Sequence, residues 1–374
     1  MSRELLGLVL IGVLCIMVSP LFKEIREIEK PKPVETRKIQ ILKRGDTIKA
    51  ANSKNIVFLS DSFLPKTFAG SELSAYETLK YMRMRGHNIN IFIKDFSVNE
   101  YDGFHIHKFD LQDRYCITSI QNADVVFMQT SNKSEYFKLV QSRNKPTFIF
   151  IHVINSYDWL LQQKMSFPIT VVYNSHMTQE RIPTFHDNMR MVPYVDTDKF
   201  KELQKYTVQN DVVCLINCNS NKGGDLFKKL AYKMSNIQFL GVKGGYANQI
   251  IDKSPPSNLT YIENQKDIRE VFKVVGILIM PSRDETWGRT AVEAMASGVP
   301  VIHSETAGLV ECVGGAGILC MRDDEDAWAE AIRRIVGDRA YRERLRQNGF
   351  KRVREIEIEQ IRGRQELALK VEKV

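Results

Sequence analysis

Cysteine is scarce and irregularly placed in this chain of 374 residues, which argues against a disulfide scaffold and against a zinc module. The six cysteines are Cys15, Cys116, Cys214, Cys218, Cys312 and Cys320. No pair has the regular spacing of a disulfide framework, and no histidine or second cysteine pair lies near Cys214 and Cys218 to complete a zinc site. We therefore expect reduced, buried thiols in a cytosolic compartment.

The sequence also lacks a motif in which basic and aromatic residues alternate, although its net charge is +8. Nucleic-acid binding is therefore not favoured. The basic residues are spread over a linker and a carboxyl-terminal tail, and attraction to an anionic membrane surface fits them better. With 43% hydrophobic and 26% charged residues, the composition is that of a globular protein long enough for two domains.

One apolar run, residues 5–22, approaches the length that spans a bilayer. It predicts a transmembrane anchor at residues 1–22, and the excess of Lys and Arg after it places the rest of the chain in the cytosol. Glycosylation sequons at Asn132 and Asn258 leave a type II anchor with a lumenal domain as the alternative. Residues 23–54 are charged and contain two prolines, which predicts a linker or stalk.

The body of the chain begins with a strand–helix–strand pattern. Residues 55–60 and 89–93 read as buried strands, and residues 73–85 read as a helix between them. Gly70 precedes this helix, where it would at least permit a tight turn. Two further buried strands are expected at residues 123–128 and 146–151, and another strand with its loop at residues 171–175. His152 follows the second of these, at a carboxyl end that faces the crevice in this class of fold, unless it is only a structural histidine.

The second half repeats this alternation of strands and helices. Strands are expected at residues 212–217, 237–242 and 258–263, with a helix at residues 225–234. Lys222 lies in the loop before that helix, where it is either a phosphate ligand or an ordinary exposed lysine. Residues 323–336 and the highly charged tail read as helices.

The most informative stretch is residues 281–302. It reads as a polar loop after a strand at residues 276–280, then a helix at residues 290–297, a capping Gly298 and another strand at residues 301–302. Ligands of open α/β sheets bind at the carboxyl ends of the strands, and the start of a helix favours an anion. The sequence therefore favours binding of an anion, such as a phosphate, between this loop and the helix that follows it.

Two carboxylates, Glu285 and Glu293, frame this stretch. They are eight residues apart, about two helical turns, so they do not form a close acid–base pair. They could instead accept hydrogen bonds from the hydroxyls of two parts of one long ligand. The alternative is an ordinary helix with one exposed and one amino-terminal glutamate.

The run P-S-x-x-E-T-x-G-x-x-x-x-E-A-M-A-x-G-x-P-V-I resembles the donor-binding signature of the family 4 retaining glycosyltransferases, also called glycosyl transferases group 1. Lys222-Gly223, Gly70-Ser71-Glu72 and residues 306–311 add to a resemblance that covers roughly residues 55–350. The chain departs from the family in three places. Ala69 replaces a glycine, Tyr194 replaces an Asn-Gly pair, and Asn217 stands where many members have arginine.

The resemblance implies a GT-B fold, an α/β architecture in which two Rossmann-like domains face a cleft. Residues 55–200 would form the acceptor domain and residues 201–345 the nucleotide-sugar domain, with a charged helix at residues 346–374. The implied enzyme is a membrane-anchored, retaining, hexosyltransferase-like glycosyltransferase. Its donor would be a UDP- or GDP-linked sugar, and its acceptor a glycan, lipid or glycoprotein. No other cofactor and no nucleic acid is expected.

The resemblance also assigns roles. Glu285 would orient the sugar, His152 would contact it, and Glu293 would hold the ribose. Lys222 and the helix start at Gly288, Arg289 and Thr290 would stabilise the diphosphate, with Arg289 compensating for Asn217.

Gly70 would let backbone amides approach the donor phosphate or the acceptor. No metal is expected, because the one Asp-x-Asp spacing, Asp196-Thr197-Asp198, falls in the segment between the domains. The alternatives are an epimerase or phosphorylase on the same fold, and a membrane-tethered binding module without catalysis.

Overall fold

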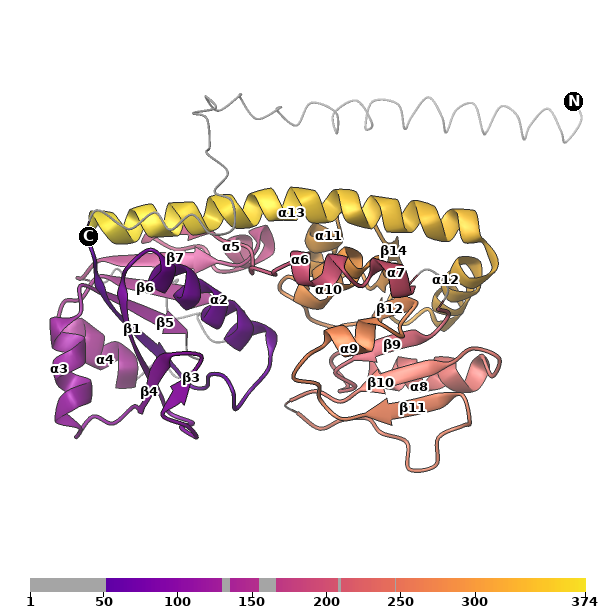
Figure 1. Ribbon diagram of the computed structural model, residues 1–374, viewed down its shortest axis with the longest axis horizontal. Helices are drawn as coiled ribbons and strands as arrows, with labels where there is room; N and C mark the ends of the chain where they lie inside the picture. Colours follow the sequence, from indigo (N-terminus) through magenta and orange to yellow (C-terminus); the bar gives the residue numbers. More distant parts are fainter. Residues whose placement is uncertain (1–51, 130–134, 155–165, 208–209, 246) are drawn as a thin grey trace, which may run out of the picture. The chain divides into compact units, whose positions relative to one another are not determined.

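The computed structural model describes residues 52–129, 135–154, 166–207, 210–245 and 247–374 (Figure 1). The anchor predicted at residues 1–22 and nearly all of the linker at residues 23–54 lie outside these ranges. Within them, no helix combines the length and apolar character needed to cross a membrane. The following description concerns the unit formed by residues 48–374.

The first half of this unit is built on a sheet with the strand order β3-β4-β2-β1-β5-β6-β7-β8 among the described residues. Its strands are β1 (Asn55–Ser60), β2 (Asn88–Ile93), β3 (Glu100–Tyr101), β4 (Phe104–Lys108), β5 (Val125–Gln129), β6 (Thr147–Ile151), β7 (Ile169–Tyr173) and β8 (Asp187–Arg190). All neighbours pair in parallel except β3 and β4. The central strands are short apolar runs buried on both faces, as parallel strands covered by helices must be.

The second half is built on a parallel sheet with the order β11-β10-β9-β12-β13-β14. Its strands are β9 (Val213–Ile216), β10 (Phe239–Val242), β11 (Leu259–Ile262), β12 (Ile277–Met280), β13 (Val301–His303) and β14 (Ile318–Leu319). The order reverses at β1 between β2 and β5, and at β9 between β10 and β12. Such switch points open a crevice at the carboxyl ends of the strands.

Helices cover both sheets (Figure 1). In the first half they are α2 (Gly70–Met84), α3 (Arg114–Asn122), α4 (Glu135–Ser142) and α5 (His176–Arg181). Two short helices, α6 (Asp198–Lys201) and α7 (Gln204–Thr207), lead into the second half. There the helices are α8 (Gly224–Lys233), α9 (Arg269–Phe272), α10 (Arg289–Ser297), α11 (Ala307–Val313) and α12 (Glu325–Gly337).

The last helix, α13 (Arg339–Lys373), runs along both halves (Figure 1). In the second half, Arg346 donates from Nε to the carbonyl of Gly298 at 3.1 Å. Further along, Gln360 donates to the carbonyl of Pro193 at 2.9 Å, and Glu372 pairs with Arg85 of the first half at 2.6 Å. The helix is continuous across residues 345 and 346, where the sequence analysis places a domain boundary.

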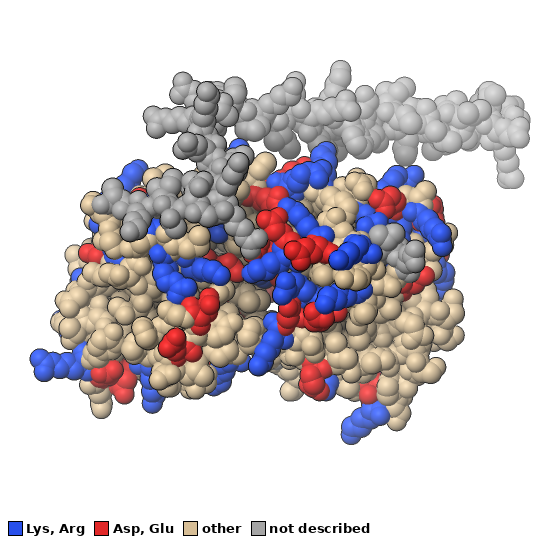
Figure 2. Space-filling model, in the orientation of Figure 1, with Lys and Arg blue, Asp and Glu red and all other residues tan. Residues whose placement is uncertain are grey.

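Charges of both signs are interspersed on the face of the molecule shown in Figure 2, without a large block of one sign. Ion pairs join residues within α13, such as Arg352 with Glu355 at 3.1 Å, and also join α13 to both halves, such as Arg342 with Asp211 and Lys370 with Asp187, each at 2.7 Å. The first kind supports a highly charged helix, and the second kind holds it against the two halves.

Two glycines of α13 give a matched test of how closely this helix packs. A Cβ on Gly363 would lie 2.9–3.2 Å from atoms of Met191, whereas one on Gly349 would meet Met295 at an ordinary 3.4 Å. Because alanine favours a helix by about 1 kcal/mol over glycine, Gly349→Ala should leave stability unchanged or raise it. Gly363→Ala should instead lower the free energy of unfolding by about 1–2 kcal/mol through overpacking. Urea unfolding measures the free energy of unfolding of both variants. Equal changes in Gly349→Ala and Gly363→Ala would contradict this account of the packing.

The helices and strands that were predicted from an apolar run or a strong helical pattern are confirmed. The strand at residues 55–60, the strand before residue 281 and the helix ending at Gly298 appear as β1, β12 and α10. The first helix begins at Gly70, three residues earlier than predicted. The structure adds elements that the sequence analysis did not predict, namely the strands β3, β4 and β8 and the helices α3, α4, α5, α6, α7, α9 and α11.

Candidate active site

A large cleft of about 1110 Å³ lies at the carboxyl ends of both sheets. All the residues that the sequence analysis proposed for the site line it: Gly70, His152, Lys222, Glu285, Gly288, Arg289, Thr290 and Glu293. The cleft therefore brings together residues from four separate stretches of the chain: the start of α2, the loops after β6 and β9, and the loop after β12 with α10.

The loop after β12 turns sharply into α10 at Gly288. Gly288 has φ +118°, a left-handed conformation, and a Cβ there would lie 2.7 Å from Leu309. Only glycine suits both conditions. No side chain caps this start of α10, so its first N–H groups face the cleft, where they can bind an anion.

Lys222 and Glu285 form an ion pair between Nζ and Oε2. Lys222 lies in the loop after β9 and Glu285 in the loop after β12, the two strands at the switch point. Their side chains are 19% and 17% exposed, so the pair is only partly screened by water. The pair places a cation and a carboxylate side by side. A ligand with a phosphate next to a hydroxylated ring could use both, since the cation suits the phosphate and the carboxylate accepts hydrogen bonds from the hydroxyls.

Lys222 is held in place by its loop. Its backbone N–H donates to the side chain of Asn219 at 2.8 Å, and Gly223 follows with φ +86°. A Cβ on Gly224 would lie 2.2 Å from the carbonyl oxygen of Cys218. This close approach of loop and helix explains the two glycines after the lysine.

Glu293 and Arg289 form a second ion pair on α10, with 2.9 Å between Nε and Oε1. The guanidinium also donates to the carbonyl of Tyr194 in the segment between the two halves. Glu293 is 5% exposed, and burial raises the pKa of its carboxyl, while the charge of Arg289 opposes that rise. Arg289 thus helps to keep a buried carboxylate ionised beside the helix start.

Asn217 occupies the position at which many members of the resembled family have an arginine. Its Oδ1 accepts a hydrogen bond from Gln249 at 3.1 Å, and the Oε1 of Gln249 accepts one from the N–H of Gly244 at 2.9 Å. A Cβ on Gly244 would lie 2.2 Å from the Asn217 side chain. A neutral amide network therefore fills this part of the cleft wall.

His152 follows β6, and its backbone carbonyl accepts a hydrogen bond from Thr286 at 2.9 Å. Thr286 in turn accepts one from Asn174 at 3.0 Å. This chain of contacts ties the Glu285 loop to the first sheet, and the sequence analysis missed it. Burial lowers the pKa of His152 to about 4, so its imidazole is neutral at neutral pH.

The low pKa of His152 predicts a loss of stability in acid. The unfolded chain binds a proton at this histidine near pH 6.5, while the folded chain does so only near pH 4. The stability that the folded chain gains from keeping His152 neutral is therefore complete above pH 6.5 and is lost as the pH falls from 6.5 to 4. The loss in the free energy of unfolding is at most about 3 kcal/mol. His152→Asn should flatten the dependence of the unfolding free energy on pH between 4 and 6.5, as measured by urea unfolding.

His105→Asn is the matched control for this test, since His105 is an exposed residue of β4 that is not among the residues lining the cleft. His87, His107 and His303 also have pKa values lowered by burial, so some slope should remain in the variant. An unchanged slope in His152→Asn would contradict the assignment of a neutral imidazole at the cleft wall.

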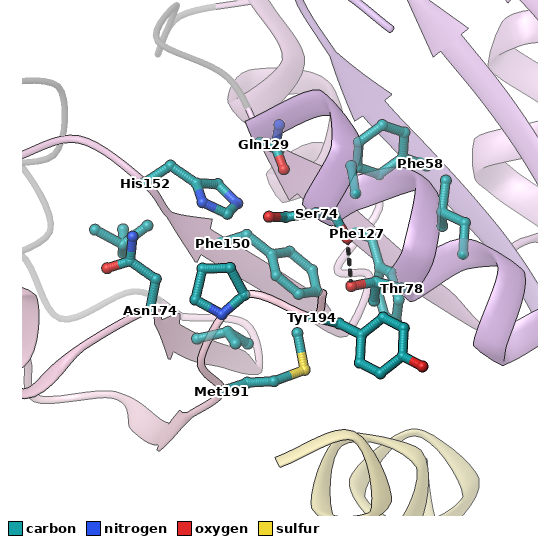
Figure 3. A pocket seen from close by; sticks show the side chains of 15 residues that line it. Phe58, Ser74, Thr78, Phe127, Gln129, Phe150, His152, Asn174, Met191 and Tyr194 are labelled. Atoms are coloured by element: carbon teal, nitrogen blue, oxygen red, sulfur yellow. Dashed lines mark hydrogen bonds between the residues drawn. The ribbon is translucent and has the colours of Figure 1, made fainter. Parts of the chain in front are cut away.

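A small cavity of about 20 Å³ lies next to the cleft (Figure 3). Its wall includes Gln129, His152 and Asn174, which stand at the carboxyl ends of the neighbouring strands β5, β6 and β7. The volume matches about one water molecule. This cavity is therefore too small for a ligand of the size that the larger cleft can hold.

Gly70 is the first residue of α2, and a Cβ there would meet nothing within 4 Å. Glu72 lies in the same first turn and accepts a hydrogen bond from Ser71 at 2.8 Å. Burial raises the pKa of Glu72, with a smaller contribution from Asp61. The start of α2 thus faces the cleft with a carboxylate already beside it.

Glu311 of α11, part of the stretch at residues 306–311, joins the two halves. Its oxygens accept hydrogen bonds from the backbone N–H groups of His176 at 2.9 Å and Met177 at 3.3 Å, at the start of α5. Arg352 of α13 donates to the carbonyl of Glu311 at 3.0 Å. No residue pattern in the sequence points to this contact.

The Asp196-Thr197-Asp198 spacing does not bring its carboxylates together on one ligand. Asp196 pairs with Lys199 at 3.3 Å and Asp198 with Lys201 at 2.9 Å. Within the part of the chain that the structure describes, no group of three or more His, Cys, Asp or Glu residues has a metal-binding arrangement.

Comparison with known proteins identifies relatives of the second half. Residues 195–352 match the family model described as Glycosyl transferases group 1, which confirms the resemblance found in the sequence. The capsular polysaccharide biosynthesis glycosyltransferase CapM of Staphylococcus aureus is 28% identical over 135 residues, 34% of this chain and 36% of that protein. A D-inositol 3-phosphate glycosyltransferase of Stackebrandtia nassauensis is 38% identical over 81 residues, 21% of this chain and 18% of that protein. The matches thus span about a third or less of these curated relatives.

The fold extends the likeness to the first half. The crystal structure of Anabaena HepE in complex with UDP-glucose superposes with a TM-score of 0.69 at 15% identity, covering 85% of this chain and 99% of that one. This likeness confirms the predicted GT-B-like fold with two Rossmann-like sheets.

Proposed function

Starting from the match of residues 195–352 to the glycosyl transferases group 1, we propose that this protein transfers a sugar from a nucleotide-diphosphate sugar to a hydroxyl acceptor, with retention of configuration. The observation that carries the proposal is the arrangement around α10. Two cation–carboxylate pairs, Lys222 with Glu285 and Arg289 with Glu293, flank an uncapped helix start in one cleft.

In the proposed complex the donor lies along these pairs. The diphosphate binds Lys222 and the first N–H groups of α10, where positive charge is concentrated. Glu285 accepts hydrogen bonds from the transferred sugar, and Glu293 accepts them from the ribose. Because Anabaena HepE is described with UDP-glucose, we take a UDP-sugar as the first donor to test and a GDP-sugar as the second.

The reaction that we propose breaks the bond between the anomeric carbon and the diphosphate oxygen. The acceptor oxygen forms the new bond to that carbon on the same face, and its proton passes to the departing diphosphate. Negative charge grows on the diphosphate while the sugar becomes positive. Lys222, the α10 start and Arg289 stabilise the first charge, and the carboxylate of Glu285 stabilises the second.

We propose that this charge stabilisation needs no divalent metal, because a lysine, an arginine and a helix start already converge on the diphosphate position. We further propose that residues 1–22 anchor the enzyme with its body in the cytosol, since basic residues follow the apolar run. A membrane-associated glycan, lipid or glycoprotein would then be the acceptor.

The test is release of nucleoside diphosphate by the purified full chain from UDP-glucose, GDP-mannose and related donors, with and without EDTA. We expect release with one nucleotide, insensitive to EDTA and stimulated by a mixture of glycan acceptors. The proposal would be wrong if no donor were cleaved with any acceptor. Retention is tested separately by NMR, which should find the anomeric configuration of the donor preserved in the product.

A second candidate is a binding module that has lost catalysis. The observation that favours it is the neutral Asn217 network, which lacks a cation where many members of the family carry one. Such a module would bind a nucleotide and release no diphosphate from its sugar, so the same assay separates the two candidates.

A further inference from the structure

The two walls of the cleft differ in charge. The acceptor wall, which we define as the described lining residues between 64 and 193, contains the carboxylates Glu72 and Glu77 and no Lys or Arg. The opposite wall, from residue 196 to residue 293, carries carboxylates as well (Asp196, Asp267, Asp284, Glu285 and Glu293), but also six cations: Lys199, Lys222, Lys243, Lys266, Arg269 and Arg289. Every cation known to line the cleft thus belongs to the donor half.

Glu72 lies in the first turn of α2 and lines the cleft together with its neighbours Gly70 and Ser71. Its carboxylate accepts a hydrogen bond from the hydroxyl of Ser71 at 2.8 Å, and no Lys or Arg among the described residues forms an ion pair with it. Its negative charge is therefore offset only by a hydroxyl and by the helix start.

Glu77 lies on the next turns of α2, and no described Lys or Arg forms an ion pair with it. The cations of neighbouring turns are engaged elsewhere. Lys66 pairs with Asp95, and Lys80 lies 3.4 Å from the hydroxyl of Tyr76 without lining the cleft. The acceptor wall thus carries two carboxylates, while neither Lys66 nor Lys80 is among its lining residues.

Aromatic side chains accompany the two carboxylates. Phe68, Tyr76 and Tyr101 line the same wall, and the rings of Tyr76 and Tyr101 pack edge to face at 5.8 Å. Tyr76 also donates to the carboxylate of Asp102, which fixes its ring. Rigid apolar faces beside hydrogen-bond acceptors suit a sugar, which offers C–H faces and hydroxyl donors.

We propose that the acceptor sugar is uncharged or carries an amine, and that Glu72 and Glu77 exclude acceptors with phosphate or carboxylate near the reacting hydroxyl. This rests on the proposed function and deepens it by naming the acceptor class. The carboxylates accept hydrogen bonds from hydroxyls or an ammonium group, whereas an anion beside them meets like charges. Such repulsion is a common source of specificity.

The test is binding of the fluorescently labelled full chain, saturated with UDP, to an array of glycans in matched pairs. The members of a pair differ only in a phosphate, sulfate or carboxylate, and a second series replaces one hydroxyl by an amine. We expect at least tenfold stronger binding to the neutral or amine member. Equal or stronger binding to the anionic member, or binding to no glycan, overturns the proposal.

Two variants show whether Glu72 and Glu77 cause the discrimination. Glu77→Lys should raise binding to anionic glycans and lower it to amine glycans, and Glu72→Gln should narrow the gap within each pair. Glu330→Lys makes the same kind of change on α12, outside the cleft. It should change neither the ratio of binding between neutral and anionic glycans nor the ratio between amine and hydroxyl glycans. Unchanged ratios in both cleft variants would overturn the proposal.

Nucleotide binding is scored independently, as the rise in melting temperature with UDP or GDP. Preserved rises in Glu72→Gln and Glu77→Lys show that these variants are folded. Failure of the wild-type chain to bind any nucleotide would count against the proposed function, whereas a preference for anionic glycans beside normal nucleotide binding would count against the acceptor class alone.

Discussion

Lys222→Met will lower the rate of sugar transfer by about a hundredfold to a thousandfold, the usual cost of removing one group that stabilises charge in the transition state. Methionine keeps the length of the side chain and removes its charge. The diphosphate then leaves without its nearest cation, and Glu285 loses its ion-pair partner. The measurement is the steady-state kcat with the donor that the wild-type chain cleaves.

Lys228→Met is the matched control for this variant. Lys228 lies on α8 and pairs with Asp252 at 3.1 Å, outside the cleft lining. The kcat of Lys228→Met should stay within a factor of about two of the wild-type value, as expected for a surface ion pair. A kcat of Lys222→Met close to that of the control would contradict a role for Lys222 in stabilising the leaving group.

Glu293→Gln will weaken nucleotide binding by about tenfold to a hundredfold, because a hydrogen bond to a charged group contributes about 1.5–3 kcal/mol. The amide keeps the shape of the buried carboxylate and removes the charge that would hold the ribose hydroxyls. Isothermal titration with the nucleoside diphosphate measures the loss. A dissociation constant within a factor of two of the wild-type value would contradict the assignment of the ribose to Glu293.

The same residue predicts how binding depends on pH. Because burial raises the pKa of Glu293, its carboxyl takes up a proton at a higher pH than an exposed glutamate does. Nucleotide binding should therefore weaken as the pH falls toward and through this raised pKa. Arg289→Ala should move that loss to higher pH, since the guanidinium opposes the rise, and it should also weaken binding if Arg289 replaces the cation missing at Asn217.

The core of this site could be predicted because it is local in sequence. The strand, loop, helix and strand around residues 281–302 carry apolar runs, two glycines with positive φ and a proline, and each acts on its immediate neighbours. The pairing of Arg289 with Glu293 could have been predicted as well, because residues four apart meet on a helix.

The remaining contacts depend on the arrangement of the two halves. Lys222 meets Glu285 only because β9 and β12 are neighbours in the sheet, and Thr286 reaches His152 only because the two sheets face one cleft. No local pattern encodes either contact. The strand β4 was not predicted because Phe104–Lys108 is short and its apolar residues alternate with histidines. The helix α3 was not predicted because it has no long apolar stripe.

The account also explains why the negative acceptor wall could not be predicted. The sequence around α2 contains lysines and arginines as well as Glu72 and Glu77. Only the structure shows that Lys66 and Lys80 turn to other partners while the two glutamates line the cleft.

The most direct test of the central claim, a nucleotide-sugar site around α10, is the melting temperature of the full chain with UDP, GDP, ADP and their sugars, with and without EDTA. A ligand that binds only the folded chain raises the melting temperature according to its concentration and affinity. The account predicts a rise with one nucleotide that EDTA leaves unchanged and that Glu293→Gln largely removes. A chain that melts at the same temperature with every nucleotide would contradict it.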